Sequence, residues 1–124
     1  MKTAARVLVL ALAASAAQAG GFTLASADIA PGATIANHFV YKGFGCSGDN
    51  VSPSLAWKNA PAGTKSFALL CHDPDAPTGG AGWWHWLVLN IPATATSLAK
   101  DAGKADGSNL PAGAAHVNTD FGGP

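Results

Sequence analysis

The chain is poor in charged residues and contains no glutamate. Only 11% of its 124 residues are charged, and Arg6 is the single arginine. From Gly20 onward the sequence has five lysines and seven aspartates, which gives a formal charge of −2. Nucleic-acid binding depends on neutralising phosphates with basic side chains. We therefore expect no nucleic-acid partner.

Long hydrophobic runs are also scarce, and the clearest one lies at the N-terminus. Lys2 and Arg6 precede the apolar residues 7–17, and Ala17-Gln18-Ala19 has the small-x-small pattern of a cleavage site. This order is typical of a secretory signal peptide, and the run is too short to span a bilayer. We predict a signal peptide at 1–19, a single mature domain at 20–124, and a periplasmic or secreted protein. A retained N-terminal anchor is the alternative.

Cysteine is limited to Cys46 and Cys71. Export would place them in an oxidising compartment, where a disulfide is permitted. Pairing them would close a loop worth roughly 3 kcal/mol in the chain-entropy model. The alternatives are that one thiol is buried and free, or that one has lost its partner.

Amphipathic helical patterns are absent from the mature sequence, which indicates a mainly β fold with long turns. Residues 66–71 and 84–91 predict two central strands. In the second, strict alternation places His85, Leu87, Leu89 and Ile91 on one face and Trp84, Trp86, Val88 and Asn90 on the other. Shorter β-prone segments are expected at 22–26, 38–41, 52–57 (an edge strand, since Pro53 cannot donate to a ladder), near 97–98 and at 116–121.

The C-terminal sequence Gly122-Gly123-Pro124 is typical of a loop. The two predicted central strands need neighbours on both sides, and few other strands are available. We therefore expect a fold that is incomplete at its C-terminus, as in a truncated product. A small domain with a frayed tail is the alternative.

Residues 72–86 concentrate two carboxylates, two imidazoles and three indoles in fifteen positions. The residues before Pro74 and Pro77 favour extended backbone, and three glycines follow that allow a tight return. This connection would place Asp73 and His85 opposite each other at one end of the strand pair. His72 alternates with Asp73, so it should point to the other face.

The Asp73–His85 pair has several interpretations on residues alone. A carboxylate orients an imidazole, and a protonated imidazole can receive an anion. A metal site would use His72, Asp73, Asp75 and His85, but no HExxH or His-x-His pattern accompanies them. Acid–base catalysis would need a nucleophile, which spacing does not identify. Asp73 and Asp75 can also simply cap the loop through backbone amides.

The motif Asp73-Pro74-Asp75-Ala76-Pro77, followed by Trp84-His85, resembles the phosphatidylethanolamine-binding protein family, in its bacterial Raf-kinase-inhibitor-like branch. The segments at 44–46, 50–57, 61–67 and 118–121 are similar to the same branch. The resemblance implies a β-sandwich-like fold with a few short helices and a small pocket for phosphate-like head groups. It also implies a later Pro-His-x-Tyr segment, which lies outside this sequence, and a later cysteine as another partner for Cys46.

Carried over by motif, the resemblance implies that Asp73 and His85 are the central pocket residues. Asp75, Pro77 and Trp84 would line or brace the pocket. The implied function is binding of a small anion or phospholipid head group, without catalytic residues, metal or cofactor. A protein-interaction or inhibitor role is the alternative, and a hydrolase is a more distant one.

Overall fold

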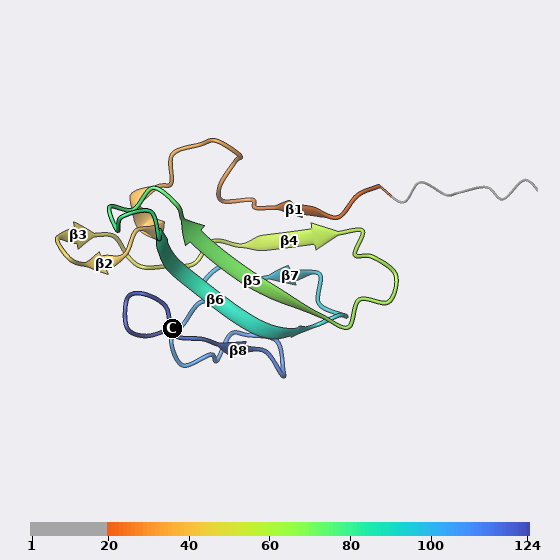
Figure 1. Ribbon diagram of the computed structural model, residues 1–124. Helices are drawn as coiled ribbons and strands as arrows, with labels where there is room; N and C mark the ends of the chain where they lie inside the picture. Colours follow the sequence, from red (N-terminus) through yellow and green to blue (C-terminus); the bar gives the residue numbers. More distant parts are fainter. Residues whose placement is uncertain (1–19) are drawn as a thin grey trace, which may run out of the picture.

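The computed structural model describes residues 20–124, so the predicted signal peptide lies outside the described residues. The described chain is mainly β, as predicted, and its one helical element is a three-residue 3-10 helix (Figure 1). None of its helical structure is long and apolar enough to cross a membrane. The elements are β1 (Thr23–Ala25), η1 (Asn37–Phe39), β2 (Lys42–Gly43), β3 (Cys46–Ser47), β4 (Leu55–Lys58), β5 (Ser66–Asp73), β6 (Trp83–Pro92), β7 (Ser97–Leu98) and β8 (Ala115–His116).

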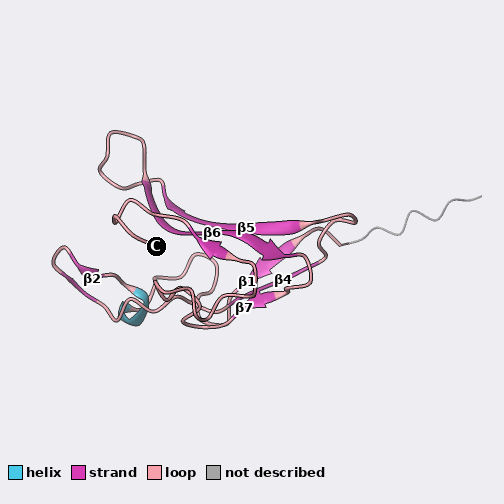
Figure 2. Ribbon diagram, turned by 90° about the horizontal axis from the view of Figure 1, so that it is seen from below, coloured by secondary structure: helices cyan, strands magenta, loops and turns pink. Residues whose placement is uncertain are grey.

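The strands form two three-stranded antiparallel sheets and one small hairpin. One sheet has the order β1-β4-β7 and the other has the order β5-β6-β8, while β2 and β3 pair only with each other. In Figure 2, β5 and β6 lie in one layer, and β1, β4 and β7 lie in another. Two parts of the predicted fold stay predictions: that the whole fold is a β-sandwich, and that it is incomplete at its C-terminus.

The hydrophobic core draws on both three-stranded sheets. Trp57 and Leu98 come from the first sheet, and Val88 and Ile91 come from the second. Val88 and Ile91 are 0% and 1% exposed. Burial of such side chains is the main stabilising contribution available to a chain with so few charges.

Two predictions about strand position were wrong. The segment 66–71 was expected to be central, but β5 is an edge strand of its sheet and Leu70 is 60% exposed. Pro53 was expected to mark an edge strand, but it precedes β4, which lies between β1 and β7. Because the proline stands outside the strand, it removes no ladder donor from β4.

Three other segments adopt a secondary structure that differs from the one predicted from the sequence. The β-prone run 38–41 instead contributes to η1, where the Val40 amide donates to the Asn37 carbonyl. The glycine-rich stretch that follows forms the β2–β3 hairpin. Of the segment 116–121, only His116 lies in a strand, as the second residue of β8. The short strand expected near 97–98 is confirmed as β7.

Strand β6 carries two irregularities that break the predicted alternation. Phe67 pairs with Ile91 and Leu69 pairs with Val88, so β6 has one extra residue there, and Asn90 adopts a left-handed φ of 56°. This bulge brings Ile91 to the buried side with Val88, although alternation had placed them on opposite faces. The second irregularity lies at the other end of β6 and determines the geometry of the candidate site.

A polar network around Asp28 fastens the long connection after β7 to the start of β4. The Asp28 carboxylate pairs with the Lys100 ammonium and accepts hydrogen bonds from the Ser54 amide (2.7 Å) and hydroxyl (2.6 Å). These contacts, first of all the Lys100 hydrogen bond, lower the pKa of Asp28 from 3.8 to about 2. The Lys100 ammonium also lies 5.6 Å from the centre of the Phe39 ring.

Replacing Asp28 by asparagine is expected to lower the melting temperature by roughly 3–6 °C at neutral pH. A lowered carboxyl pKa contributes stability above the unfolded-state pKa, and that contribution is lost as the pH falls toward about 2. The difference between the two proteins should therefore narrow from pH 4 downward in thermal melts followed by circular dichroism. Asp75→Asn, which changes an exposed loop carboxylate, is the control; an equal effect there would contradict the role of the network.

Candidate functional site

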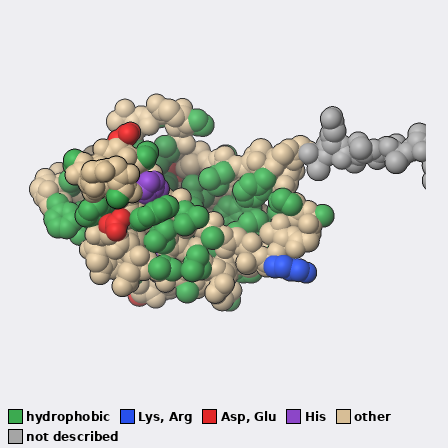
Figure 3. Space-filling model, in the orientation of Figure 1, with side chains coloured by type: hydrophobic (Ala, Val, Ile, Leu, Met, Phe, Trp, Pro, Cys, Tyr) green, Lys and Arg blue, Asp and Glu red, His purple; other side chains and the backbone are tan. Residues whose placement is uncertain are grey.

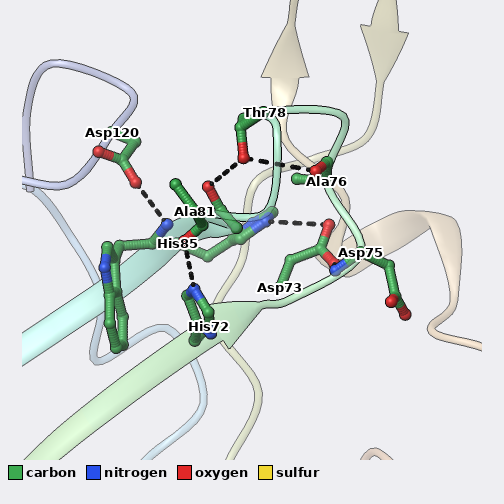
Figure 4. A network of polar contacts seen from close by, with 10 residues as sticks. His72, Asp73, Asp75, Ala76, Thr78, Ala81, His85 and Asp120 are labelled. Carbon is green, nitrogen blue, oxygen red and sulfur yellow. Dashed lines mark hydrogen bonds and ion pairs between the residues drawn. The ribbon is translucent and has the colours of Figure 1, made fainter.

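The candidate site lies where the β5–β6 strand pair opens into the loop at 74–82. Asp73 is the last residue of β5, and its Oδ1 accepts a hydrogen bond from the Asp75 amide at 3.0 Å. On the return, the Thr78 hydroxyl donates to the Gly82 carbonyl at 3.0 Å. The prolines and these side-chain-to-backbone bonds hold the loop in a non-helical course. The loop therefore presents Asp73 and His85 from adjacent strands (Figure 4).

A β-bulge places His85 beside Asp73. Cys71 pairs with Trp86 and His72 pairs with Trp84, so His85 is the extra residue of β6. Bulges re-aim side chains, and here His85 and Trp86 both line the same cavity, together with Cys71. Strict alternation had predicted His85 and Trp86 on opposite faces, which was wrong.

The structure brings Asp73 and His85 together as predicted. The His85 Nε2 atom lies 4.0 Å from the Asp73 Oδ2 atom, and the two side chains are 41% and 45% exposed. Figure 4 shows the two side chains directed toward each other, with Asp75 pointing away from them. The pair is therefore accessible and oriented, but it is not a tight buried ion pair.

His72 and Trp84 lie together on the opposite face. Their rings pack in a tilted arrangement, with centroids 4.2 Å apart and an interplanar angle of 35°, and the His72 Nε2 atom contacts the Ala81 carbonyl at 3.3 Å. His72 is thus turned away from Asp73, as predicted. The Trp84 indole does not line the cavity; instead its backbone amide donates to the Asp120 carboxylate at 2.7 Å.

The other positions implied by the family resemblance are also displaced from the cavity. Asp75 and Pro77 are exposed loop residues, and neither lines it; Asp73 is also absent from the lining and reaches the cavity only through its contact with His85. A neighbouring tryptophan was missed: the Trp83 ring packs edge-on against Phe121 at 5.7 Å, and Phe121 packs against His85 at 5.0 Å. Trp83, and not Trp84, is therefore the tryptophan near His85. The sequence carries no signal for this difference, because it follows from the position of the bulge.

The cavity next to His85 has a volume of about 200 Å³. Its walls are mostly apolar and aromatic, with hydroxyl and amide groups from Tyr41, Asn50, Ser52 and Thr119. Figure 3 shows a histidine surrounded by hydrophobic side chains, with acidic side chains near it. A second groove of about 380 Å³ lies beside Phe22 and Trp57, but no titratable side chain lines it. Ligand sites combine apolar walls with a few polar groups, which favours the smaller cavity.

Cys46 and Cys71 are both free, so the direct disulfide considered from the sequence is not formed. Cys46 belongs to the β2–β3 hairpin, whereas Cys71 lies in β5 and lines the cavity. Cys71 is an exposed residue, but partial desolvation of its thiol raises the pKa of Cys71, and the negative charge of Asp73 raises it further. Cys71 is therefore a weak nucleophile, because the thiolate is the reactive form.

Cys71 is expected to react with iodoacetamide several-fold more slowly than Cys46 at neutral pH. Both cysteines belong to exposed residues, so the difference rests on the raised pKa of Cys71, which leaves less thiolate. Single-thiol variants, Cys46→Ser and Cys71→Ser, allow each rate to be measured by mass spectrometry. Equal rates would show that the environment of Cys71 does not suppress its thiolate.

Gly82 packs too closely against the site for any side chain to be accommodated. It has a φ of 70°, and a Cβ atom there would overlap the His72 imidazole and approach the Asp73 carbonyl. Gly79 has a similar φ of 75°, but nothing lies within 4 Å of its Cβ position. The two glycines therefore separate the cost of the backbone conformation from the cost of steric overlap.

Gly82→Ala is expected to destabilise the protein more than Gly79→Ala. Both substitutions incur the left-handed backbone cost of about 1–2 kcal/mol. Only Gly82→Ala adds an overlap cost of about 1–3 kcal/mol, because His72 and the end of β5 must shift. Urea unfolding of both variants measures the difference, and equal losses would contradict the close packing.

The side chains that the metal-binding alternative would need are not brought together. Among residues 20–124, no three histidine, cysteine or aspartate side chains converge in a way that could hold a metal ion. His72, which that alternative required, faces away from Asp73 and His85. The arrangement is instead one imidazole and one carboxylate beside an apolar cavity.

Residues 25–124 match the family model described as phosphatidylethanolamine-binding protein. The chain therefore belongs to the phosphatidylethanolamine-binding protein family.

Two Escherichia coli K12 proteins are similar in sequence. The chain is 52% identical to the UPF0098 protein YbcL over 122 residues, which are 98% of this chain and 66% of YbcL. It is 48% identical to the UPF0098 protein YbhB over 99 residues, which are 80% of this chain and 61% of YbhB. The chain thus spans somewhat less than two thirds of the length of these relatives.

Solved structures agree with this assignment. The crystal structure of E. coli YbcL, described as a new member of the mammalian PEBP family, superimposes with a TM-score of 0.79 at 54% identity. The match covers 82% of this chain and 61% of the YbcL chain. A homologue from Chlamydia trachomatis, with a TM-score of 0.64 and 24% identity over 83% of this chain and 64% of that one, shares the fold.

Proposed function

We propose that this protein is an exported binding protein that holds a small anion, such as the phosphate of a phospholipid head group, in the cavity beside His85. The observation that carries the proposal is the placement of His85 in the wall of that cavity, 4.0 Å from Asp73. Membership in the phosphatidylethanolamine-binding protein family supports the same ligand class.

The chemistry of the cavity suits one anionic group. A protonated imidazole offers a positive charge and N–H donors, and hydrogen bonds to charged groups are stronger than neutral ones. The Asp73 carboxylate can stabilise that protonated form and orient the ring. Tyr41, Asn50 and Ser52 add neutral donors at the cavity wall.

Titration with inorganic phosphate and phosphoethanolamine tests the proposal directly. We expect saturable changes in the His85 side-chain NMR signals, with much smaller changes at His38, an exposed histidine that pairs with Asp49 at 2.8 Å. Unchanged His85 signals at millimolar ligand would reject anion binding at this site.

Binding without turnover is the second part of the proposal. The cavity includes the Cys71 thiol, but burial and the charge of Asp73 raise its pKa. The Ser52 hydroxyl in the same wall accepts a hydrogen bond from the Gly103 amide at 2.8 Å, a structural contact. We expect no release of phosphate from phosphoethanolamine, and sustained release that is lost in His85→Ala would contradict the proposal.

Export rests on the N-terminal sequence. Residues 1–19 have the charged start, apolar run and Ala-Gln-Ala end of a secretory signal. Expression in a Gram-negative host should therefore give periplasmic protein that begins at Gly20. N-terminal sequencing of the periplasmic fraction checks this expectation, and an uncleaved protein in the membrane fraction would favour the retained anchor.

A further inference from the structure

The β2–β3 hairpin holds a bulky aromatic residue in a costly conformation. Its two-residue turn is Phe44-Gly45, with φ values of 50° and 85°. Such turns favour asparagine or glycine at the first position, and a left-handed φ is unusual for a bulky residue. Phe44 is nonetheless 78% exposed. Strained backbone and an exposed aromatic ring in one residue suggest a role in contacting something outside the fold.

Phe44 belongs to an aromatic cluster, which we define as Tyr41, Phe44 and Phe121. The Tyr41 ring lies 4.5 Å from Phe121 and 5.6 Å from Phe44. Phe44 and Phe121 lie 6.0 Å apart and are nearly parallel, with an interplanar angle of 21°. A Cβ atom at Gly43 would overlap the Tyr41 ring, so that glycine allows the tyrosine to lie against the hairpin.

The aromatic cluster is continuous with the His85 site. Phe121 lies 5.0 Å from His85, edge to face, and both Phe121 and Tyr41 line the cavity with His85. Neither lysine nor arginine lines the cavity, so the His85 imidazole is the one basic side chain among its lining residues. The site therefore offers one place for negative charge beside several aromatic ring faces.

The size of the cavity limits what can enter. Its volume is about 200 Å³, whereas a protein cavity of about 150 Å³ accommodates benzene. One six-membered ring with a small charged head is thus close to the upper limit for a fully enclosed ligand. Aromatic rings gain from offset or edge-to-face contact with other rings beyond simple area burial, which favours a planar aromatic ring over a saturated one.

We propose that the ligand of this site is a small aryl anion, in which a planar aromatic ring packs against the aromatic cluster while its anionic oxygen group contacts His85. This inference rests on the proposed anion-binding function and adds the chemistry of the group attached to the anion, which is an aromatic ring. Phe44 does not itself line the cavity; it packs on Tyr41 and Phe121 and would act on the ligand ring through these two residues.

Affinities for methyl, cyclohexyl and phenyl phosphate, measured by calorimetry, test this ligand class. All three carry the same head group, and the last two have six-membered rings of similar size. We expect phenyl phosphate to bind about tenfold tighter than methyl phosphate and about threefold tighter than cyclohexyl phosphate. Phe121→Leu should lower the phenyl-to-methyl ratio about threefold or more, because leucine keeps apolar bulk without a ring face. Phe44→Leu should lower the ratio less, because Phe44 contacts the cavity only through Tyr41 and Phe121.

Phe22→Leu is the matched control, since Phe22 is also exposed but lines the other groove; it should leave all three affinities unchanged. If methyl phosphate binds and phenyl phosphate is no tighter, or if cyclohexyl phosphate equals phenyl phosphate, the aryl inference is overturned while anion binding stands. If none of the three esters and no inorganic phosphate perturbs His85, the proposed function itself fails.

Discussion

His85→Ala is expected to lower the affinity for inorganic phosphate and phosphoethanolamine by about 10- to 100-fold. A hydrogen bond to a charged group contributes about 1.5–3 kcal/mol, which corresponds to that range of dissociation constants. The cavity wall contains no lysine, arginine or second histidine that could replace it. Isothermal titration calorimetry of the purified chain measures the change.

His72→Ala is the matched control for this substitution. His72 lies thirteen residues earlier on the paired strand, but its ring packs against Trp84 on the opposite face of the sheet. Its loss should leave the affinity within about twofold of the original, because it does not contact the cavity. Equal losses in both variants would indicate a structural effect on the β5–β6 pair rather than contact with the ligand.

The second large effect is expected from Ile91→Ala, at about 2–4 kcal/mol of unfolding free energy. Ile91 is 1% exposed and packs in the core that draws on both three-stranded sheets. Truncation removes buried apolar area and leaves a cavity that the surrounding strands can fill only in part. Urea unfolding followed by tryptophan fluorescence gives the free energy, provided that the transition stays two-state.

Leu70→Ala serves as the control because it removes an aliphatic side chain of the same size from β5. Leu70 is 60% exposed, so its loss should cost less than about 0.5 kcal/mol. A large loss at Leu70 would mean that the outer face of the β5–β6–β8 sheet is covered in solution. A small loss at Ile91 would mean that the shared core is not well packed.

Much of the fold follows from local patterns. The absence of amphipathic helices predicted a mainly β chain, and the apolar runs at 66–71 and 84–91 became the two longest strands, β5 and β6. The prolines and glycines between them predicted the loop that presents Asp73 and His85. These features depend on backbone preferences of neighbouring residues, which the sequence carries directly.

Local sequence patterns could not predict the strand order or the residues that face the cavity. Whether β5 or β4 lies at an edge depends on pairing between distant segments, such as Leu55 with Leu98. Alternation also assigned Ile91 to the wrong face, because a left-handed Asn90 inserts an extra residue into β6. A period of two gives no warning of a bulge, and one inserted residue reverses every assignment beyond it.

The amino-acid sequence predicted two ingredients of the site, an Asp73–His85 pair and a stiff proline-containing loop. Tertiary structure settled which aromatic rings join the pair. The bulge at His85 sends Trp84 to the opposite face with His72, while Phe121 arrives from the C-terminal segment and Tyr41 from beside the hairpin. Contacts between residues so far apart arise only when the strands pair and the loops close over the core, because no local preference encodes them.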